Sequence, residues 1–242
     1  DEKRTSQVQF NFPPIAGIFT VDNLSAGDLM SETSSLPAAR RGRPRIEDIE
    51  ELNEHILRVA SEMFLRCGFD GTTIDAIAAS ARISKRTLYA RYSDKAALFR
   101  AVLDDLIARW LVPIDRFRAS DDDLDTTLAK LGHYLATFSL QGYSVGVNRI
   151  VISEAERRPE LGQMIIETAK KPAIAMIKAI LVRHQKELRK VDPEIAAEQF
   201  LSLMADNLLR RAHLRDMPTS REINRWVHAS VDLFLHGIRR EN

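Results

Sequence analysis

The sequence predicts an all-α fold, with a small N-terminal domain followed by a larger C-terminal helical domain. From Ile46 onward, apolar residues recur at three- and four-residue steps, which is the period of amphipathic helices. No segment shows the sustained alternation of a half-buried strand, and no internal repeat is present. The chain has 242 residues, of which 45% are hydrophobic, so it is long enough to build a core without disulfides.

The composition restricts the class of protein. The single cysteine, Cys67, excludes a disulfide framework and a multi-cysteine metal site, and it fits a reducing, cytoplasmic environment. No apolar run reaches the roughly 18 residues of a membrane span, so we expect no membrane association. The formal net charge is only +1, so a nucleic-acid-binding surface must come from a local concentration of basic residues.

Residues 1–45 differ from the rest of the chain. They contain four of the nine prolines, show no helical period and end in the basic run Arg40–Arg45. We therefore expect them to be mostly disordered. Met30 would make a natural start, which leaves open whether residues 1–29 belong to the native protein.

Capping signals set the first helices. The apolar period that begins at Ile46 ends at Gly68, a residue suited to close a helix. Thr72, followed three residues later by Asp75, is a capping-box pattern that opens a helix over Ile74–Ala81.

Further helices follow to the end of the chain. Ser84 caps a second short helix, and Ser93 or Asp94 opens a longer one that Pro113 ends. Pro172 lies inside a later helical pattern and should kink or break it. The expected helices of the body span about 122–140, 144–157, 159–185, 193–214 and 219–239.

Residues 72–95 have the organisation of a helix-turn-helix. A helix of about nine residues, a turn at Ala81–Ile83 and a helix of about eight residues follow one another closely, and in this motif the second helix enters the DNA major groove. At 100° per residue, Leu88 and Tyr92 share the side of the second helix that packs inward. The candidate reading face on the other side holds Lys85, Arg86, Tyr89 and Ala90.

The distribution of charge supports this interpretation. Residues 82–100 contain six basic residues and one acid, a local net charge of +5. Lys85 and Arg86 stand in the first turn of one helix and Lys95 in the first turn of the next. A cation at a helix start interacts unfavourably with the helix dipole, which destabilises the helix by about 0.3–1 kcal/mol per charge. The alternative is a solvated surface, but cations at two successive helix starts indicate an anion that binds there, and nucleic-acid phosphates are the obvious candidate.

Three short motifs stand in this region: Thr72–Ala78 (TTIDAIA), Ile83–Tyr92 (ISKRTLYARY) and Asp94–Phe99 (DKAALF). Together, within about residues 46–103, they resemble the DNA-binding domain of TetR-family transcriptional regulators. Arg82 stands where the family usually has glycine in the turn. Residues 145–165 resemble, more loosely, the C-terminal domain of AefR-like members.

The resemblance implies a three-helix DNA-binding head, a helical body, a homodimer, and repression of a double-stranded DNA operator that a small ligand relieves. Lys95 would hold a phosphate at the start of the fourth helix. The residues that would approach bases or phosphates are Thr73, Lys85, Arg86, Thr87, Tyr89 and Arg91.

The basic run before the first helix is a second candidate contact. Arg41 and Arg43 on a flexible arm could enter a narrow minor groove, where the negative potential is enhanced. A plain basic linker with non-specific attraction to DNA remains the alternative.

Two apolar stripes near the C-terminus favour a dimer. Two helices from each subunit would form a four-helix interface, although both stripes could instead belong to the monomer core. The first stripe consists of Phe200, Leu201, Leu203, Met204, Leu208 and Leu209, and the second of Ile223, Trp226, Val227, Val231, Phe234, Leu235 and Ile238.

The central helices would enclose the site of a small hydrophobic effector. Each candidate residue is individually more typical of core than of a ligand contact. His133 has no partner at a metal-ligand spacing, so we expect no metal and no cofactor. The candidate pocket residues are Trp110, Phe117, His133, Tyr134, Phe138, Met164 and Met176.

The sequence thus predicts three parts: a disordered basic extension (1–45), a helix-turn-helix domain (46–95) and a ligand-binding and dimerisation domain (96–242). A ligand in the body would move the fourth helix and change the distance between the two reading heads. No zinc spacing, phosphate-binding glycine loop or nucleophile elbow suggests an enzyme. A DNA-bound scaffold or an activator without an inducer remains an alternative.

Overall fold

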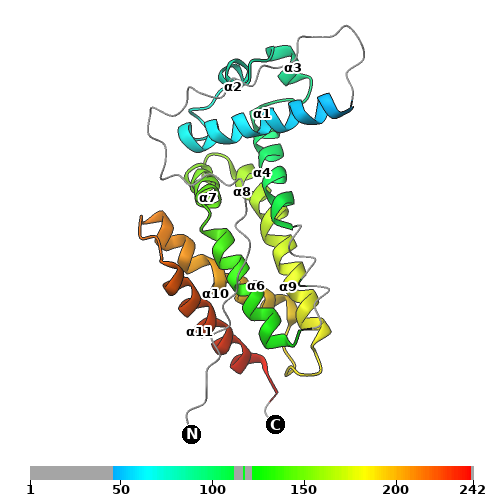
Figure 1. Ribbon diagram of the computed structural model, residues 1–242, viewed down its shortest axis with the longest axis vertical. Coiled ribbons are helices and arrows are strands. Elements are labelled where there is room, and N and C mark those ends of the chain that lie inside the picture. Colours follow the sequence, from blue (N-terminus) through cyan, green and yellow to red (C-terminus); the bar gives the residue numbers. More distant parts are fainter. Residues whose placement is uncertain (1–45, 112–116, 118–121, 241–242) are drawn as a thin grey trace. The chain divides into compact units, whose positions relative to one another are not determined.

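The prediction of an all-α fold is confirmed in the computed structural model, which describes residues 46–111, 117 and 122–240 (Figure 1). Over these residues the structure contains helices, one isolated antiparallel bridge between Leu188 and Arg239, and no strand. The predicted extension 1–45 lies outside the described residues.

The helices follow the predicted order. The N-terminal ones are α1 (Ile46–Cys67), α2 (Ile74–Ser80), α3 (Lys85–Tyr89) and α4 (Lys95–Leu111). The body contains α6 (Leu124–Ser139), α7 (Gly142–Glu154), α8 (Pro159–Ile165), a π-helix (Ile166–Lys170), α9 (Lys171–Arg183), α10 (Pro193–His213) and α11 (Ser220–Ile238). The second helix of the helix-turn-helix is shorter than expected, at five residues.

Two of the predicted helix ends are confirmed. Gly68 has a φ of 75°, the left-handed conformation that closes α1. Ser84 caps α3, because its hydroxyl oxygen accepts the backbone N–H of Thr87 at 3.0 Å.

The predicted cap of α2 was wrong by one residue. Thr73 is the N-cap, and its Oγ1 accepts the backbone N–H of Ala76 at 3.1 Å. Thr72 is fully buried, and its hydroxyl lies 2.7 Å from the carbonyl oxygen of Gly68, to which it donates a hydrogen bond. Thr72 therefore closes the turn that follows α1 and leaves the cap to its neighbour.

The helical pattern predicted for 159–185 is not simply broken at Pro172. The chain runs through α8 into the π-helix Ile166–Lys170 and then into α9, with Pro172 near the start of α9. Proline has no N–H to donate and its ring crowds the preceding turn. The wider π-helical turn, Ile166–Lys170, lies just before Pro172, where the missing N–H and the proline ring disturb regular α-helical hydrogen bonding.

The body packs around α6, which lies beside α10 and α11 (Figure 1). Gly132 on α6 allows this close approach, since a Cβ there would lie 2.7 Å from Sδ of Met204 and 3.3 Å from Cγ1 of Val227. Asp123 caps α6 by accepting the backbone N–H of Thr126 at 2.7 Å.

The two apolar stripes belong largely to the monomer core, which was the alternative to a dimer interface. Leu201, Leu203, Leu209, Ile223 and Trp226 are only partly buried. The stripe residues that are buried within the single chain are Phe200, Met204, Leu208, Val227, Val231, Phe234, Leu235 and Ile238.

A second apolar core joins the N-terminal helices to the body. Val147, Ile150 and Val151 of α7 and Leu161 of α8 are buried in the same cluster as Phe64, Leu88 and other residues of α1–α4. Consequently the predicted boundary at residue 95 does not coincide with a break in the apolar core, because the N-terminal helices share one core with α7 and α8.

Candidate nucleic-acid interface

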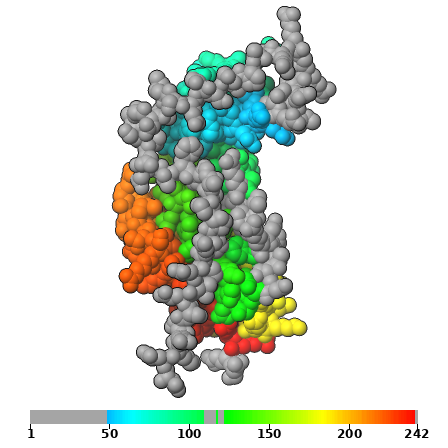
Figure 2. Space-filling view, in the orientation of Figure 1, coloured from blue at the N-terminus to red at the C-terminus, as the bar shows by residue number. Residues whose placement is uncertain are grey.

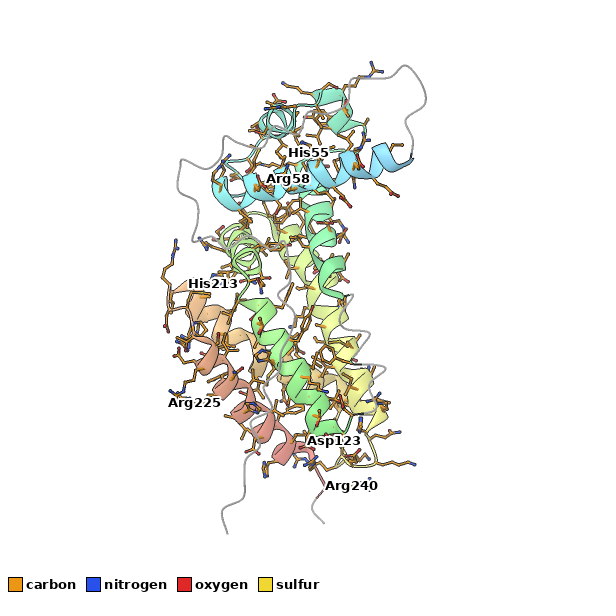
Figure 3. The ribbon with its side chains drawn as sticks, in the orientation of Figure 1. His55, Arg58, Asp123, His213, Arg225 and Arg240 are labelled. Atoms are coloured by element: carbon orange, nitrogen blue, oxygen red, sulfur yellow. The ribbon has the colours of Figure 1, made fainter. Side chains whose placement is uncertain are left out.

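The turn of the helix-turn-helix keeps its geometry without glycine. Arg82 adopts a φ of 55°, in the left-handed region that favours glycine. Its backbone N–H donates to the carbonyl of Ala79 at 3.1 Å, and the N–H of Ile83 donates to the carbonyl of Ala78 at 3.0 Å. The turn is also held to α1, because Nε2 of His55 lies 3.2 Å from the carbonyl oxygen of Ala81 (His55 is labelled in Figure 3).

The two faces of α3 divide as predicted. Leu88 is fully buried, whereas the side chain of Tyr89 is half exposed and Ala90 is exposed. Tyr92 is partly buried, and its hydroxyl donates to Oδ1 of Asn53 on α1 at 2.6 Å. Packing of Leu88 and Tyr92 against the core therefore fixes which side of α3 faces outward.

The outward side of α3 carries two exposed cations. Lys85 forms an ion pair with Asp75 of α2, with Nζ 2.5 Å from Oδ2, and both side chains are more than half exposed. Arg86 is exposed and has no side-chain hydrogen bond or ion pair within the described part of the chain. Figure 2 shows the surface of α2 and α3 next to that of α1. Thus Arg86 and Tyr89 are the predicted contacts that need no rearrangement to reach a ligand.

The hydroxyls among the predicted contacts have structural partners. Thr73 is exposed, but its Oγ1 already caps α2. Thr87 is partly buried, and its Oγ1 lies 2.7 Å from Oγ of Ser84. Arg91 is partly buried beside an open groove between α1 and α4.

Lys95 has a structural role that the sequence did not indicate. Its Nζ donates to the carbonyls of Phe69 at 2.7 Å and Thr72 at 3.0 Å, and lies 4.5 Å from the centroid of the Phe69 ring. Partial burial lowers the pKa of Lys95. A phosphate contact by Lys95 stays a prediction, and only one of its three N–H donors remains for it. The start of α4 is capped by Asp94, whose Oδ1 accepts the backbone N–H of Ala97 at 2.8 Å.

The predicted arm contacts, Arg41 and Arg43, lie outside the described residues, as does the side chain of Trp110. They stay predictions.

Most of the other predicted pocket residues lie together in the core of the body. Phe117 packs against Tyr134 with ring centroids 5.8 Å apart, and both belong to the cluster that contains Met176 and Phe138. Burial raises the pKa of Tyr134. Met164 does not join them, because it packs against the core of the N-terminal helices.

His133 on α6 is half-buried. Burial, and to a smaller extent the charge of His228, lowers its pKa, which favours the neutral imidazole.

A cluster that the sequence analysis missed lies where the body meets the turn between α1 and α2. Arg158 donates from Nη2 to Oδ1 of Asp70 at 2.6 Å. This hydrogen bond lowers the pKa of Asp70. The two residues are 88 positions apart in the chain, so no local pattern could have paired them.

Two family models match the chain. One, described as bacterial regulatory proteins of the tetR family, covers residues 56–102, and the other, described as the C-terminal domain of AefR-like transcriptional repressors, covers residues 126–237. None of the described helices is long and apolar enough to cross a membrane.

Similar proteins point the same way. An uncharacterized HTH-type transcriptional regulator of Mycobacterium tuberculosis is 27% identical over 177 residues, which is 73% of this chain and 82% of that protein. A protein described as a TetR-family transcriptional regulator from Mesorhizobium loti has a similar structure, with a TM-score of 0.70 and 22% identity over 79% of this chain and 98% of its own. The flavonoid-responsive regulator FrrA has a TM-score of 0.63 and 27% identity over 80% of this chain and 100% of its own.

The helix-turn-helix and its basic outer face define a DNA-binding transcriptional regulator. The chain belongs to the TetR family, and its body is an AefR-like C-terminal domain. Regulators of this family bind DNA and are dimeric.

Proposed function

We propose that this protein is a repressor that binds a palindromic operator as a homodimer and is released by a small lipophilic effector. The observation that carries the DNA-binding part is the division of α3, with Leu88 buried and Arg86 and Tyr89 exposed on the opposite side. Arginine reads guanine edges or phosphates, and a tyrosine side chain can contact either the backbone or a thymine methyl group.

The surface between α10 and α11 is our candidate for the dimer interface. It contains an open groove of about 730 Å³, whose lining includes Leu203, Trp226 and Leu233. The side chain of Leu233 is 66% exposed in the single chain, and a second copy would bury it. A dimer on this surface presents two α3 helices, which must lie about 34–36 Å apart to enter successive major grooves.

The aromatic cluster in the body is our candidate for the effector site. Phe117, Tyr134, Phe138 and Met176 offer an apolar environment with a phenol for orientation. His133, on the same helix as Tyr134, adds an imidazole whose burial favours the neutral form. FrrA is flavonoid-responsive by its name, and flavonoids combine flat aromatic rings with hydroxyl groups. A polyphenol of this class fits the chemistry of the cluster.

The test begins with sequencing of genomic DNA captured by the purified protein. We expect a palindrome with half-sites spaced by about one turn of DNA or a multiple of it. The selected site is then used in fluorescence anisotropy, with quercetin as the probe of release. Release from DNA, together with a thermal shift caused by quercetin, supports the repressor.

Two outcomes contradict parts of the proposal. Capture of DNA without a palindrome contradicts the homodimer on a two-fold site. Tight DNA binding with neither release nor thermal shift across flavonoids and fatty acids supports the scaffold or activator instead.

A further inference from the structure

The turn between α7 and α8 contacts the DNA-binding head directly. α7 ends at Glu154 and α8 begins at Pro159, and the backbone N–H of Arg158 donates to the carbonyl of Glu154 at 2.7 Å. This tight turn, residues 154–158, lies against the loop between α1 and α2. It is a place where body and head meet through polar contacts, beside the apolar core that they share.

Arg158 makes three contacts from this turn. Nη2 donates to Asp70 at 2.6 Å, Nε lies 3.5 Å from Oε2 of Glu154, and the guanidinium lies 5.2 Å from the centroid of the Phe69 ring. Charge-assisted hydrogen bonds and cation–π contacts are directional, so together they restrict where the loop can lie. The Glu154 side chain is only 8% exposed, which keeps this carboxylate close to its cations.

On the head side, the same loop is held by Lys95. The ring of Phe69 lies 5.2 Å from the Arg158 guanidinium and 4.5 Å from Nζ of Lys95, so one aromatic side chain meets a cation from the α7–α8 turn and a cation from the start of α4. Lys95 also binds the carbonyl of Thr72, and Thr73, the next residue, caps α2. A continuous set of contacts therefore runs from the α7–α8 turn to the first turn of the helix-turn-helix.

We propose that Arg158 is a positioning residue for DNA binding: it fixes the orientation of α2 and α3 relative to the body through Phe69 and Asp70. A change in the body that withdraws the α7–α8 turn separates Arg158 from Asp70 and releases the helix-turn-helix from its DNA-binding orientation. This inference rests on the proposed function in taking the body to control DNA binding. It adds the α7–α8 turn to α4 as a connection through which the body acts on the helix-turn-helix.

The neighbouring arginine provides a matched control. Arg157 carries the same charge and lies 3.6 Å from Asp70 and 3.4 Å from Glu154, but its side chain is 66% exposed. No contact between Arg157 and the Phe69 ring is found among the described residues. Replacing Arg157 or Arg158 with alanine thus removes the same charge, but only Arg158→Ala removes the 2.6 Å hydrogen bond to Asp70 and the contact with the Phe69 ring.

The experiment compares the full-length wild type, Arg157→Ala, Arg158→Ala and Arg158→Lys. DNA affinity is measured by fluorescence anisotropy on the captured site. The distance between the two heads of a dimer is measured by pulsed electron spin resonance with a nitroxide on Cys67, which is the single cysteine of the chain and is exposed at the end of α1. Thermal unfolding of each variant reports whether the fold is intact.

We expect Arg158→Ala to weaken DNA binding about 2- to 30-fold, the range for residues that couple two sites, and to broaden the distance distribution. Arg157→Ala should match the wild type in both measurements. Arg158→Lys should recover part of the affinity, because it keeps a cation near Phe69 and Asp70 but loses the planar fork.

Other results overturn the inference. If Arg158→Ala lowers the melting temperature but keeps wild-type affinity, Arg158 is only a stabilising residue. Equal losses in Arg157→Ala and Arg158→Ala would indicate a simple charge effect. If the purified wild type captures no specific DNA site, the proposed function fails instead. If the spin-labelled wild type gives no measurable distance between two nitroxides, this result counts against the proposed dimer. The DNA affinities of the variants then decide whether Arg158 positions the helix-turn-helix.

Discussion

Replacing Arg82 with glycine should stabilise the protein, although it removes a cation from the helix-turn-helix. Arg82 has a φ of 55° in the turn between α2 and α3, and its backbone N–H is bonded to Ala79 in that conformation. The neighbouring hydrogen bonds and the buried side chain of Ala81 leave the turn little freedom to relax. The strain of the left-handed conformation is therefore present in the folded state.

The magnitude follows from two opposing effects. A left-handed conformation costs a residue with a Cβ about 1–2 kcal/mol, and glycine avoids this cost. Glycine also gains freedom in the unfolded chain, which offsets about 0.4–1 kcal/mol of the benefit. With the middle of each range, the net stabilisation is about 0.8 kcal/mol, or roughly 2–3 °C in melting temperature for a chain of this size.

Arg82→Ala is the matched control, because it removes the same charge but keeps the Cβ and hence the strain. Thermal unfolding by circular dichroism, at several salt concentrations, compares the two variants with the wild type. We expect Arg82→Gly to melt above Arg82→Ala at every salt concentration. Equal melting temperatures for the two variants would refute the strain argument, because charge would then account for the whole effect.

Three further predictions concern other parts of the chain. Lys95→Met should destabilise the protein by about 1–3 kcal/mol, because it leaves two carbonyls of the α1–α2 loop without their donor. Thermal unfolding measures this loss, with Arg100→Met on the exposed side of α4 as the control that should have a much smaller effect. Equal effects of the two substitutions would contradict the role of Lys95. Hydrogen bonds from the backbone and hydroxyl of Thr219 lower the pKa of Glu222 from 4.5 to about 2. The contribution of the Glu222 carboxylate to stability is therefore present above pH 4.5 and is lost as the pH falls towards 2. The melting temperatures of the wild type and Glu222→Gln should converge as the pH falls through this interval, and parallel curves would contradict the predicted pH dependence. If the π-helix before Pro172 lets the body adapt to an effector, Pro172→Ala should shift the quercetin concentration that gives half release from DNA, and superimposable release curves would dispose of that role.

The sequence was sufficient for features that depend on neighbouring residues. The helical period gave the order of helices, Gly68 ended α1 and Ser84 capped α3, because each of these depends on residues within one or two turns. The inward side of α3 also followed from the period, since Leu88 had to face the core. These are local signals with a single reading.

Features that depend on distant groups could not be predicted. Thr72 and Thr73 both suit a helix cap, and the choice between them depends on how the chain folds back on the end of α1, where the carbonyls of Met63, nine residues earlier, and Gly68 accept the Thr72 hydroxyl. Lys95 turns inward because the loop after α1 presents carbonyls that only the folded chain brings near it. The partner of Arg158 is on another helix-to-helix connection far away in the sequence, so its role emerged only from the structure.

The apolar stripes of α10 and α11 show a related limit. Periodicity indicates which side of a helix is apolar, but not which neighbour covers it. In the structure α6 packs against both α10 and α11, and α9 also packs against α10. The partly exposed residues such as Leu203 and Trp226 border the groove that we propose for the partner subunit.

The central claim is that the outward side of α3 grips DNA. Its most direct test is the salt dependence of operator affinity for Lys85→Ala/Arg86→Ala, with Lys186→Ala as a control, because Lys186 is an exposed cation of the body far along the chain from α3. Each lost phosphate contact reduces the slope of log affinity against log salt by about 0.9, so two residues in each subunit of a dimer should reduce it by about 3 to 4 and weaken binding strongly at physiological salt. Wild-type affinity and slope in the double variant would contradict the claim.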